Sequence, residues 1–229
     1  VLNKIRETLM NAFGGEFSQI IIGGAPLNAE VEAFLRRIKF PVTVGYGMTE
    51  TAPLISFTPW TDFRSQSCGQ VLKGFMDARI ANPDMDGVGE IQVRGENVMA
   101  GYYKNEQATK ESFTADGWLR TGDLGIIDKD GFIYIKGRCK TMLLGPSGQN
   151  IYPEEIEAKI NNMPYVLESL VLQKDTRLVA LVCPDFEAVD ADKLTQDQLE
   201  VVMEENRKLV NAELAAYEQI NELRIYTHE

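Results

Sequence analysis

The sequence predicts an α/β protein, α+β overall, in which the end of a large α/β domain with an antiparallel β subdomain precedes a small α+β C-terminal domain. Three observations predict this class. Short apolar runs alternate with helical patterns in the first 50 residues. Apolar segments separated by Gly and Asp turns fill the middle of the chain, and a new helical pattern opens at Pro153. We therefore place the domains at residues 1–139 and 140–229.

Length and charge limit the possible functions. A chain of 229 residues corresponds to about one and a half domains at roughly 150 residues each. Its 44% hydrophobic and 25% charged residues are ordinary for a globular protein. The net charge of −11 argues against a nucleic-acid partner, which requires a basic face. No apolar run approaches the roughly 18 residues that span a bilayer, so we expect no transmembrane segment.

The first region is expected to form a parallel α/β layer. Residues 1–13 have a helical apolar stripe formed by Leu2, Ile5 and Leu9. The apolar runs at 19–22 and 41–46 each end at glycine and are typical of buried strands. Between them, Asn28 is a predicted helix cap. The apolar stripe of that helix consists of Val31, Phe34, Leu35 and Ile38.

The middle region is expected to be antiparallel. Its predicted strands are 76–81, 88–94, 125–128 and 132–136. Residues 128–131 are expected to form a hairpin turn, and Asn105 is expected to cap a short helix over 106–112.

The last region begins with a helix from Pro153 to Ile160, because proline favours a first helical position. Strands are expected at 166–172, 178–182 and 223–226. Before the last of these, a Thr195/Gln198 capping box opens a long helix. The buried stripe predicted for this helix is Leu199, Val202, Leu209 and Leu214.

Cysteine and histidine usage excludes several chemistries. Cys68, Cys139 and Cys183 lie far apart in the sequence, and His228 is the only histidine, so neither a zinc nor an iron–sulfur site is expected. Histidine-based acid–base catalysis is excluded for the same reason. Free thiols in a reducing cytoplasm are the preferred interpretation. Residues 185–229 hold 12 acidic and four basic residues, which we interpret as a solvated helix face rather than a docking tail.

Three constellations carry candidate chemistry. Residues 45–51 (Gly-Tyr-Gly-Met-Thr-Glu-Thr) directly follow a predicted strand, where ligands collect in open α/β sheets. Glycine lets the backbone approach a phosphate, a threonine hydroxyl can donate to it, and a glutamate can hold Mg²⁺. An ordinary polar turn remains an equal alternative for this segment taken alone.

The second constellation, residues 118–124, presents Asp123 after a Thr-Gly pair; such a carboxylate can accept hydrogen bonds from both ribose hydroxyls. Turn chemistry is the alternative. The third constellation joins Arg138, whose guanidinium can bridge a ribose or a phosphate, to a glycine-rich stretch at 145–150 ahead of a helix. That stretch can equally be a linker between domains.

Together and in this order, the three constellations resemble the adenylate-forming (AMP-binding) superfamily of acyl-CoA synthetases, non-ribosomal peptide adenylation domains and luciferases. The segments 47–53 and 150–157 look most like bacterial long-chain fatty-acid–CoA ligases. The resemblance implies that ATP or AMP, Mg²⁺ and coenzyme A are the cofactors and that a fatty acid is the further small-molecule substrate. Segment 89–95 with the following Gly101-Tyr102 matches a structural motif of that superfamily.

The resemblance also implies roles for individual residues. The catalytic positions are Thr49, which contacts phosphate, and Glu50, which is the Mg²⁺ ligand. Asp123 holds the ribose and Arg138 the ribose or phosphate. Tyr46 stacks on the adenine, and Gly148 lies in a loop lining the pantetheine path. The remaining cofactor-binding positions are Gly24, Ala25 and Pro26 beside the adenine, with Gly47 and Met48 next to Thr49. Lys140 occupies the hinge about which the small domain rotates between the two half-reactions.

Some expected parts have no counterpart in the sequence. The Ser/Thr/Gly-rich loop ending in Pro-Lys that grips the ATP β- and γ-phosphates is missing. A catalytic lysine would follow the strand around Ile225, and none of the present lysines has that context. We therefore expect a C-terminal fragment whose small domain is incomplete and mobile, and which is inactive by itself. The resemblance implies a cytoplasmic location, with contact at the inner membrane face left open.

Three functional hypotheses follow. In the first, the chain belongs to a ligase that forms acyl-CoA through an acyl-adenylate and releases AMP and pyrophosphate. In the second, the same fold loads the phosphopantetheine of a carrier protein. In the third, the chain is a catalytically inactive nucleotide-binding scaffold. Neither the acyl chain length nor the oligomeric state is predicted by the sequence.

Overall fold

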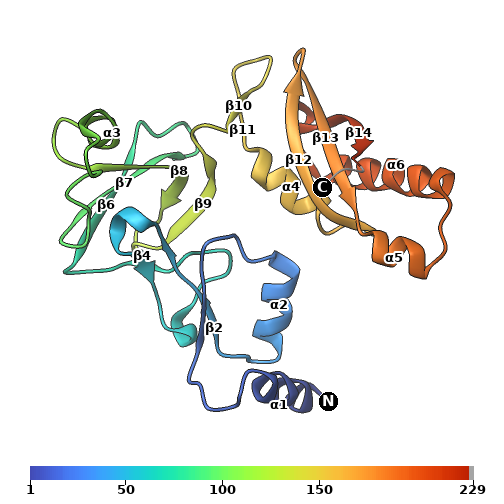
Figure 1. Cartoon of the computed structure of the whole chain (residues 1–229), viewed down its shortest axis with the longest axis horizontal. Helices are drawn as coiled ribbons and strands as arrows, with labels where there is room; N and C mark the ends of the chain where they lie inside the picture. Colours follow the sequence, from blue (N-terminus) through green and yellow to red (C-terminus); the bar gives the residue numbers. More distant parts are fainter. Residues whose placement is uncertain (227–229) are drawn as a thin grey trace. The chain divides into compact units, whose positions relative to one another are not determined.

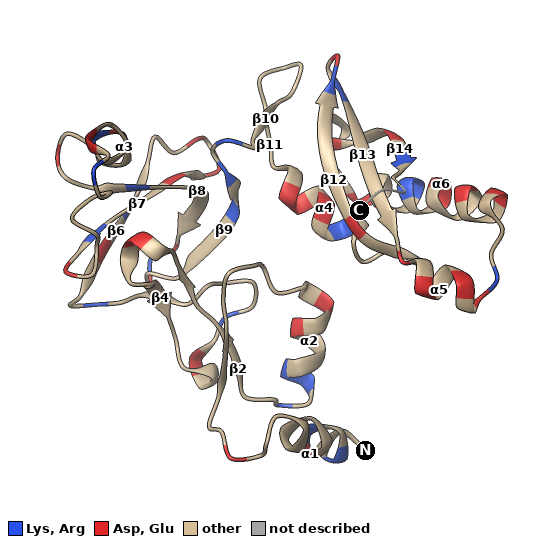
Figure 2. Ribbon diagram, viewed as in Figure 1, with Lys and Arg blue, Asp and Glu red and all other residues tan. Residues whose placement is uncertain are grey.

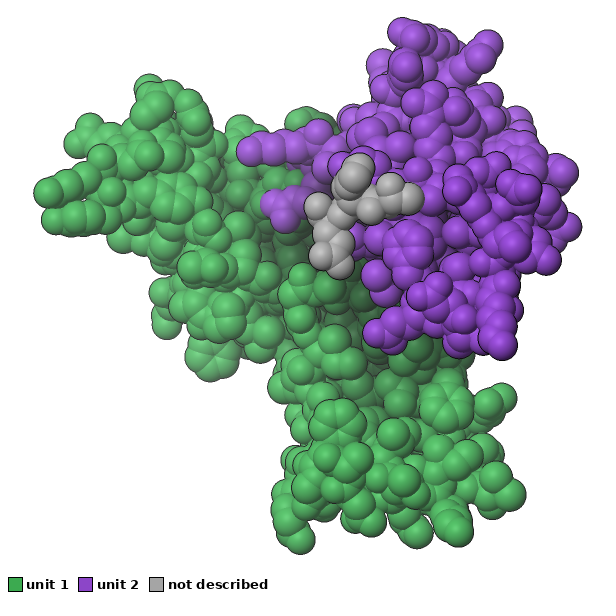
Figure 3. All heavy atoms as spheres, turned by 45° about the vertical axis from the view of Figure 1, so that its right-hand side comes forward, with its two compact units in different colours: residues 1–136 green, residues 137–229 purple. Residues whose placement is uncertain are grey.

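The structure, a computed structural model, describes residues 1–226 and divides the chain into two compact units, Val1–Lys136 and Gly137–Glu229. The elements are labelled in Figure 1, and the two units are coloured separately in Figure 3. The mixed α/β class with antiparallel sheets is confirmed. His228 lies outside the described residues.

The first unit begins with a parallel α/β layer. Strand β1 (Ile20–Ile22) pairs in parallel with β2 (Val42–Val44), and helix α2 (Ala29–Arg37) connects them. Asn28 Oδ1 accepts hydrogen bonds from two amides of the first turn of α2, as its predicted capping role requires. Helix α1 (Leu2–Ala12) packs through Ile5 and Leu9 against a small core centred on Ile38, Phe40 and Val42.

Part of the predicted burial in this layer is wrong. Leu2, Val31 and Ile21 are exposed, because the β1–β2 sheet has only two strands and each helix covers just part of it. Glu32 is buried instead, with 1% of its surface exposed. Its carboxylate accepts hydrogen bonds from the Ser65 hydroxyl and from the amide and side chain of Gln66, so it ties the loop at 65–66 to α2.

Two antiparallel sheets form the rest of the first unit. One has the order β3-β4-β5 and the other the order β6-β7-β8-β9. The strands are β3 (Tyr46–Gly47), β4 (Leu54–Phe57), β5 (Gln70–Val71), β6 (Met76–Ala81), β7 (Gly89–Gly95), β8 (Leu119–Ile127) and β9 (Ile133–Arg138). Short helical turns lie at η1 (Thr49–Thr51) and η2 (Trp60–Asp62), and helix α3 (Glu106–Ser112) is capped by Asn105. A core cluster that includes Tyr46, Ile55, Ile91 and Ile133 fills the space between these sheets.

The strand prediction needs three corrections here. The run at 41–46 divides between β2 and β3, which belong to different sheets. Strands β4 and β5 were not predicted. Strand β8 begins at Leu119 rather than at residue 125, so the Thr-Gly-Asp segment lies inside a strand and not in a turn.

The second unit is an α+β layer. Strand β13 (Arg177–Pro184) pairs antiparallel with β12 (Val166–Lys174) and parallel with β14 (Ile220–Ile225). Helices α4 (Pro153–Ile160), α5 (Phe186–Ala191) and α6 (Gln196–Glu213) supply the remaining core with Ile156, Val189 and Met203 among the buried residues. The hairpin β10 (Leu143–Leu144) and β11 (Asn150–Ile151) precedes α4, and the short turn η3 (Ala216–Glu218) precedes β14.

The Thr195/Gln198 capping box of α6 is confirmed, since each side chain accepts from the other residue's amide. The predicted stripe is only partly right, because Leu209 is 60% exposed. The buried positions are Leu199, Met203, Asn206 and Val210. Asn206 enters the core because its amide group donates to the carbonyl of Pro164.

Charge and membrane topology complete the description. In Figure 2 the acidic residues, coloured red, recur along α5 and α6, which agrees with a solvated helix face. Within residues 1–226, no helix combines the length and the apolar character needed to cross a membrane.

Replacing Glu32 with Ala is expected to lower the unfolding free energy of the first unit by about 2 kcal/mol, because the hydrogen bonds that this buried carboxylate accepts from Ser65 and Gln66 are lost. Both tryptophans, Trp60 and Trp118, lie in this unit, so urea unfolding followed by tryptophan fluorescence measures it. Glu30→Ala on the same helix is the control and should cost less than half as much. Equal effects of the two substitutions would contradict the conclusion that Glu32 ties the loop at 65–66 to α2.

Candidate functional site

The candidate site starts at the carboxyl ends of β1 and β2. Ile22 O accepts a hydrogen bond from Gly45 N at 2.9 Å, so the segments that follow the two strands leave the sheet at the same edge. One of them holds Gly24, Ala25 and Pro26, all exposed in the loop before α2. The other holds the predicted phosphate and metal residues.

The second segment is a tight turn. At Gly47 a Cβ atom would lie 1.8 Å from Pro53 O, so only glycine permits this backbone approach. Met48 N donates to that same carbonyl at 2.7 Å, and Thr49–Thr51 then form η1. Thr49 is exposed and Glu50 is half-buried on this turn. The predicted catalytic pair therefore sits on a rigid, accessible turn.

Tyr46 and Asp123 meet across 77 positions of sequence. The Tyr46 hydroxyl donates to Asp123 Oδ2 at 2.6 Å. Both side chains are largely buried, with exposed fractions of 7% and 9%. Tyr46 belongs to the three-stranded sheet and Asp123 to the four-stranded one, so this hydrogen bond joins the two sheets of the first unit.

A bulge in β8 aims Asp123 at Tyr46. Between the pairs Glu90–Leu124 and Gln92–Arg120, strand β7 has one residue whereas β8 has three. Gly122 takes a φ of +72° there, a conformation that favours glycine. Thr121 Oγ1 donates to Ile91 O at 2.7 Å and accepts from Asp123 N at 3.1 Å. The Thr-Gly-Asp segment therefore turns the carboxylate inward without ending the strand.

The surroundings of Tyr46 favour the protonated form of its phenol. Burial raises the pKa of the Tyr46 phenol well above its usual value near 10, and the adjacent Asp123 carboxylate raises it further. Tyr46 therefore remains a hydrogen-bond donor over the physiological pH range.

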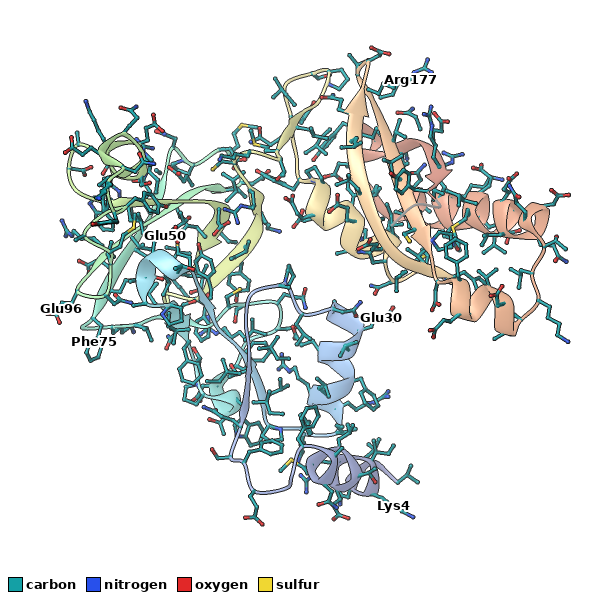
Figure 4. All side chains as sticks on the ribbon, in the orientation of Figure 1. Lys4, Glu30, Glu50, Phe75, Glu96 and Arg177 are labelled. Atoms are coloured by element: carbon teal, nitrogen blue, oxygen red, sulfur yellow. The ribbon has the colours of Figure 1, made fainter. Side chains whose placement is uncertain are left out.

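Glu50 is held by a segment that the sequence did not indicate as part of the site. Tyr102 Oη donates to Glu50 Oε1 at 2.7 Å, and Met99 N donates to Glu50 O at 2.8 Å. Asn97 donates through its side chain to the carbonyls of Thr51 and Leu54. Glu50 is labelled in Figure 4. The Gly101-Tyr102 motif was the only sequence signal in this segment, and it gave no indication of its partner.

Arg138, Lys140 and Gly148 belong to the second unit. Arg138 is the exposed last residue of β9, and Lys140 is exposed in the turn that follows. Gly148 lies in the loop of the β10–β11 hairpin, with Gly145 N donating to Gln149 O at 2.8 Å. This stretch therefore forms a hairpin loop near the start of the second unit.

The residues present fit Mg²⁺ only together with a ligand. No group of three or more acidic, histidine or cysteine side chains in residues 1–226 is arranged to hold a metal ion. Mg²⁺ is commonly held by one or two carboxylates plus substrate phosphates, keeping several waters. The half-buried carboxylate of Glu50, next to exposed Thr49, meets that requirement.

Residues 2–103 match the protein family described as AMP-binding enzyme. A long-chain-fatty-acid–CoA ligase of Mycobacterium bovis is 36% identical over 186 residues, which are 81% of this chain and 30% of that relative. A long-chain-fatty-acid–CoA ligase of Bos taurus is 34% identical over 210 residues, 87% of this chain and 28% of that protein. The chain thus spans about 30% of the length of the curated relatives it matches.

Solved structures agree with this match. The ATP-bound MatB of Rhodopseudomonas palustris shares 30% identity and a TM-score of 0.71 over 93% of this chain and 42% of its own.

Replacing Tyr46 with Phe is expected to lower the unfolding free energy of the first unit by about 1–3 kcal/mol, because Asp123 loses a buried donor. The raised pKa of Tyr46 also predicts how the stability of the first unit changes with pH. The folded state holds the phenolic proton more tightly than the unfolded chain, so this stabilisation is complete below about pH 10 and is lost as the pH rises above it.

Urea unfolding by tryptophan fluorescence between pH 7 and 11 measures both effects. The wild-type protein should lose stability above pH 10 more steeply than Tyr46→Phe. Parallel curves for the two proteins would contradict a proton held between Tyr46 and Asp123.

Proposed function

Because this chain belongs to the AMP-binding enzyme family, we propose that it works as part of an ATP-dependent long-chain fatty-acid–CoA ligase. In this function a fatty carboxylate attacks the ATP α-phosphorus to form acyl-adenylate and pyrophosphate. The thiol of coenzyme A then attacks the acyl carbonyl and AMP leaves. Negative charge develops on phosphorus oxygens in the first step, so the protein contributes mainly positioning and electrostatic stabilisation.

The hydrogen bond between Tyr46 and Asp123 is the observation that carries this proposal. Adenine and ribose are joined by one covalent bond, so the residues that contact them must be neighbours. We assign Asp123 to the ribose hydroxyls and Tyr46 to the adenine. The loop with Gly24, Ala25 and Pro26 leaves the same sheet edge as Tyr46 and is assigned to the adenine side.

The turn after Tyr46 is assigned to the phosphate. Three residues along the chain, Thr49 presents an exposed hydroxyl that can donate to a phosphate oxygen, with the Gly47 and Met48 backbone beside it. Glu50 would hold Mg²⁺, which neutralises charge on the phosphates when it is bound. In this arrangement the base, sugar and phosphate contacts follow one another along the nucleotide.

The second unit is assigned to the nucleoside and to the second half-reaction. Arg138 would contact the ribose or phosphate through its planar guanidinium. Lys140 would act as the hinge about which the small domain rotates, so that a different face of that domain meets the nucleotide in each half-reaction. The loop with Gly148 would line the path of coenzyme A. Exposure of Lys140 in a turn supports a hinge, because such a residue can change its backbone angles without unpacking a core.

A cytoplasmic location is part of the proposal. The three cysteines, Cys68, Cys139 and Cys183, lie far apart in the sequence, and this spacing favours a reducing compartment over a disulfide framework.

The protein that carries this chain is expected to release AMP and pyrophosphate when it is supplied with ATP, Mg²⁺, coenzyme A and a long-chain fatty acid. Product analysis by anion-exchange chromatography separates AMP from ADP. Release of ADP and inorganic phosphate would contradict adenylation.

The acceptor is tested in the same assay. Replacing coenzyme A with a phosphopantetheinyl carrier protein should reduce product formation strongly. Faster acylation of the carrier protein would instead favour an adenylation domain that loads such a carrier. Binding of ATP without release of AMP or pyrophosphate would instead favour a catalytically inactive scaffold, whereas full activity in an Asp123→Ala variant would contradict the assignment of Asp123 to the ribose.

A further inference from the structure

A tyrosine outside the assigned nucleotide contacts holds the carboxylate of Glu50. Tyr102 Oη donates to Glu50 Oε1 at 2.7 Å across 52 positions of sequence. The same segment also bonds the main chain of this residue, since Met99 N donates to Glu50 O at 2.8 Å. Both the backbone and the side chain of Glu50 are therefore fixed by residues 99–102.

The start of α3 fixes the position of Tyr102. Tyr102 N donates to Thr109 Oγ1 at 2.8 Å, and this hydroxyl donates to Asn105 O at 2.9 Å. Asn105 N donates back to Tyr102 O at 3.2 Å, while Asn105 Oδ1 caps the helix at Ala108 N. The backbone of Tyr102 is thus held in a hydrogen-bonded turn. This order lowers the entropy lost when the Tyr102 hydroxyl forms its hydrogen bond.

Residues that hydrogen-bond to metal ligands orient them and tune their affinity for the ion. We propose that Tyr102 is a positioning residue for Mg²⁺, whose hydroxyl orients the Glu50 carboxylate before the ion and the nucleotide bind. This inference rests on the proposed role of Glu50 as the Mg²⁺ ligand. It adds to that role a residue whose own side chain contacts neither substrate nor ion.

A purely structural role for the same hydrogen bond predicts something different. The bond would then only anchor the segment at 99–102 to the turn η1. That anchor has other supports, because Met99 N bonds Glu50 O and the Asn97 side chain bonds the carbonyls of Thr51 and Leu54. Removing the Tyr102 hydroxyl should therefore leave the fold intact, and its effect on metal binding can be measured separately.

The test titrates Mn²⁺, a spectroscopic substitute for Mg²⁺, into the protein at saturating AMP and follows free Mn²⁺ by electron paramagnetic resonance. Tyr102→Phe is expected to weaken Mn²⁺ binding about tenfold or more. Its AMP affinity without metal and its thermal unfolding should match those of the wild type. Tyr103→Phe is the control, since Tyr103 is the adjacent tyrosine and is 88% exposed, and it should bind Mn²⁺ as the wild type does.

Glu50→Gln separates failure of this inference from failure of the proposed function. If Glu50→Gln weakens Mn²⁺ binding but a folded Tyr102→Phe variant binds Mn²⁺ as tightly as the wild type, or more tightly, the positioning role is overturned. If Glu50→Gln leaves Mn²⁺ binding unchanged, or if the wild type shows none, the assignment of Glu50 to the metal fails first and the positioning role fails with it.

Discussion

The hydrogen bond from the Tyr46 hydroxyl to Asp123 is the interaction on which the candidate site depends. It is buried, and it joins the two sheets of the first unit through two residues that we assign to the nucleotide. A buried carboxylate is costly unless it is hydrogen-bonded, so the partner of Asp123 cannot be lost without penalty. The same contact therefore stabilises the core and fixes the spacing between the two residues that we propose for the base and the ribose.

Two local distortions make this contact possible. The bulge at Thr121–Asp123 sets three residues of β8 against one of β7, while the inward side chains still alternate from Leu119 through Thr121 to Asp123. The close approach of Gly47 to Pro53 lets the chain leave β3 and form η1 directly after Tyr46. Each distortion occurs at a glycine beside an assigned residue, so glycine permits the backbone geometry that positions the neighbouring side chain.

The sequence predicted much of the fold because the signals were local. Asn28, Pro153 and the Thr195/Gln198 pair mark helix starts through contacts within a few residues, and all three hold. Burial was harder to predict. Leu209 and Val31 fit a helical stripe but are exposed, whereas Glu32 and Asn206 are buried because distant loops supply their hydrogen-bond partners.

The candidate site was predictable to the same extent. Residue types alone indicate phosphate, Mg²⁺ and ribose contacts for Thr49, Glu50 and Asp123, whereas the adenine contact of Tyr46 is implied only by the family resemblance. Their supporting contacts are not local, since Tyr102 reaches Glu50 and Tyr46 reaches Asp123 only after the sheets assemble. From the sequence we also interpreted the Thr-Gly-Asp segment as a turn. A glycine in a β-bulge cannot be distinguished from a glycine in a turn until the partner strand is known.

The assignment of Asp123 to the ribose, beside Tyr46, is tested most directly by the relative affinity of the protein for AMP and 2′-deoxy-AMP, measured by isothermal titration calorimetry for the wild type and Asp123→Asn. Hydrogen bonds to a charged group contribute about 1.5–3 kcal/mol, so the wild type should prefer AMP by roughly tenfold or more. The Asn variant should lose most of that preference. Equal affinity of the wild-type protein for both nucleotides would contradict the assignment.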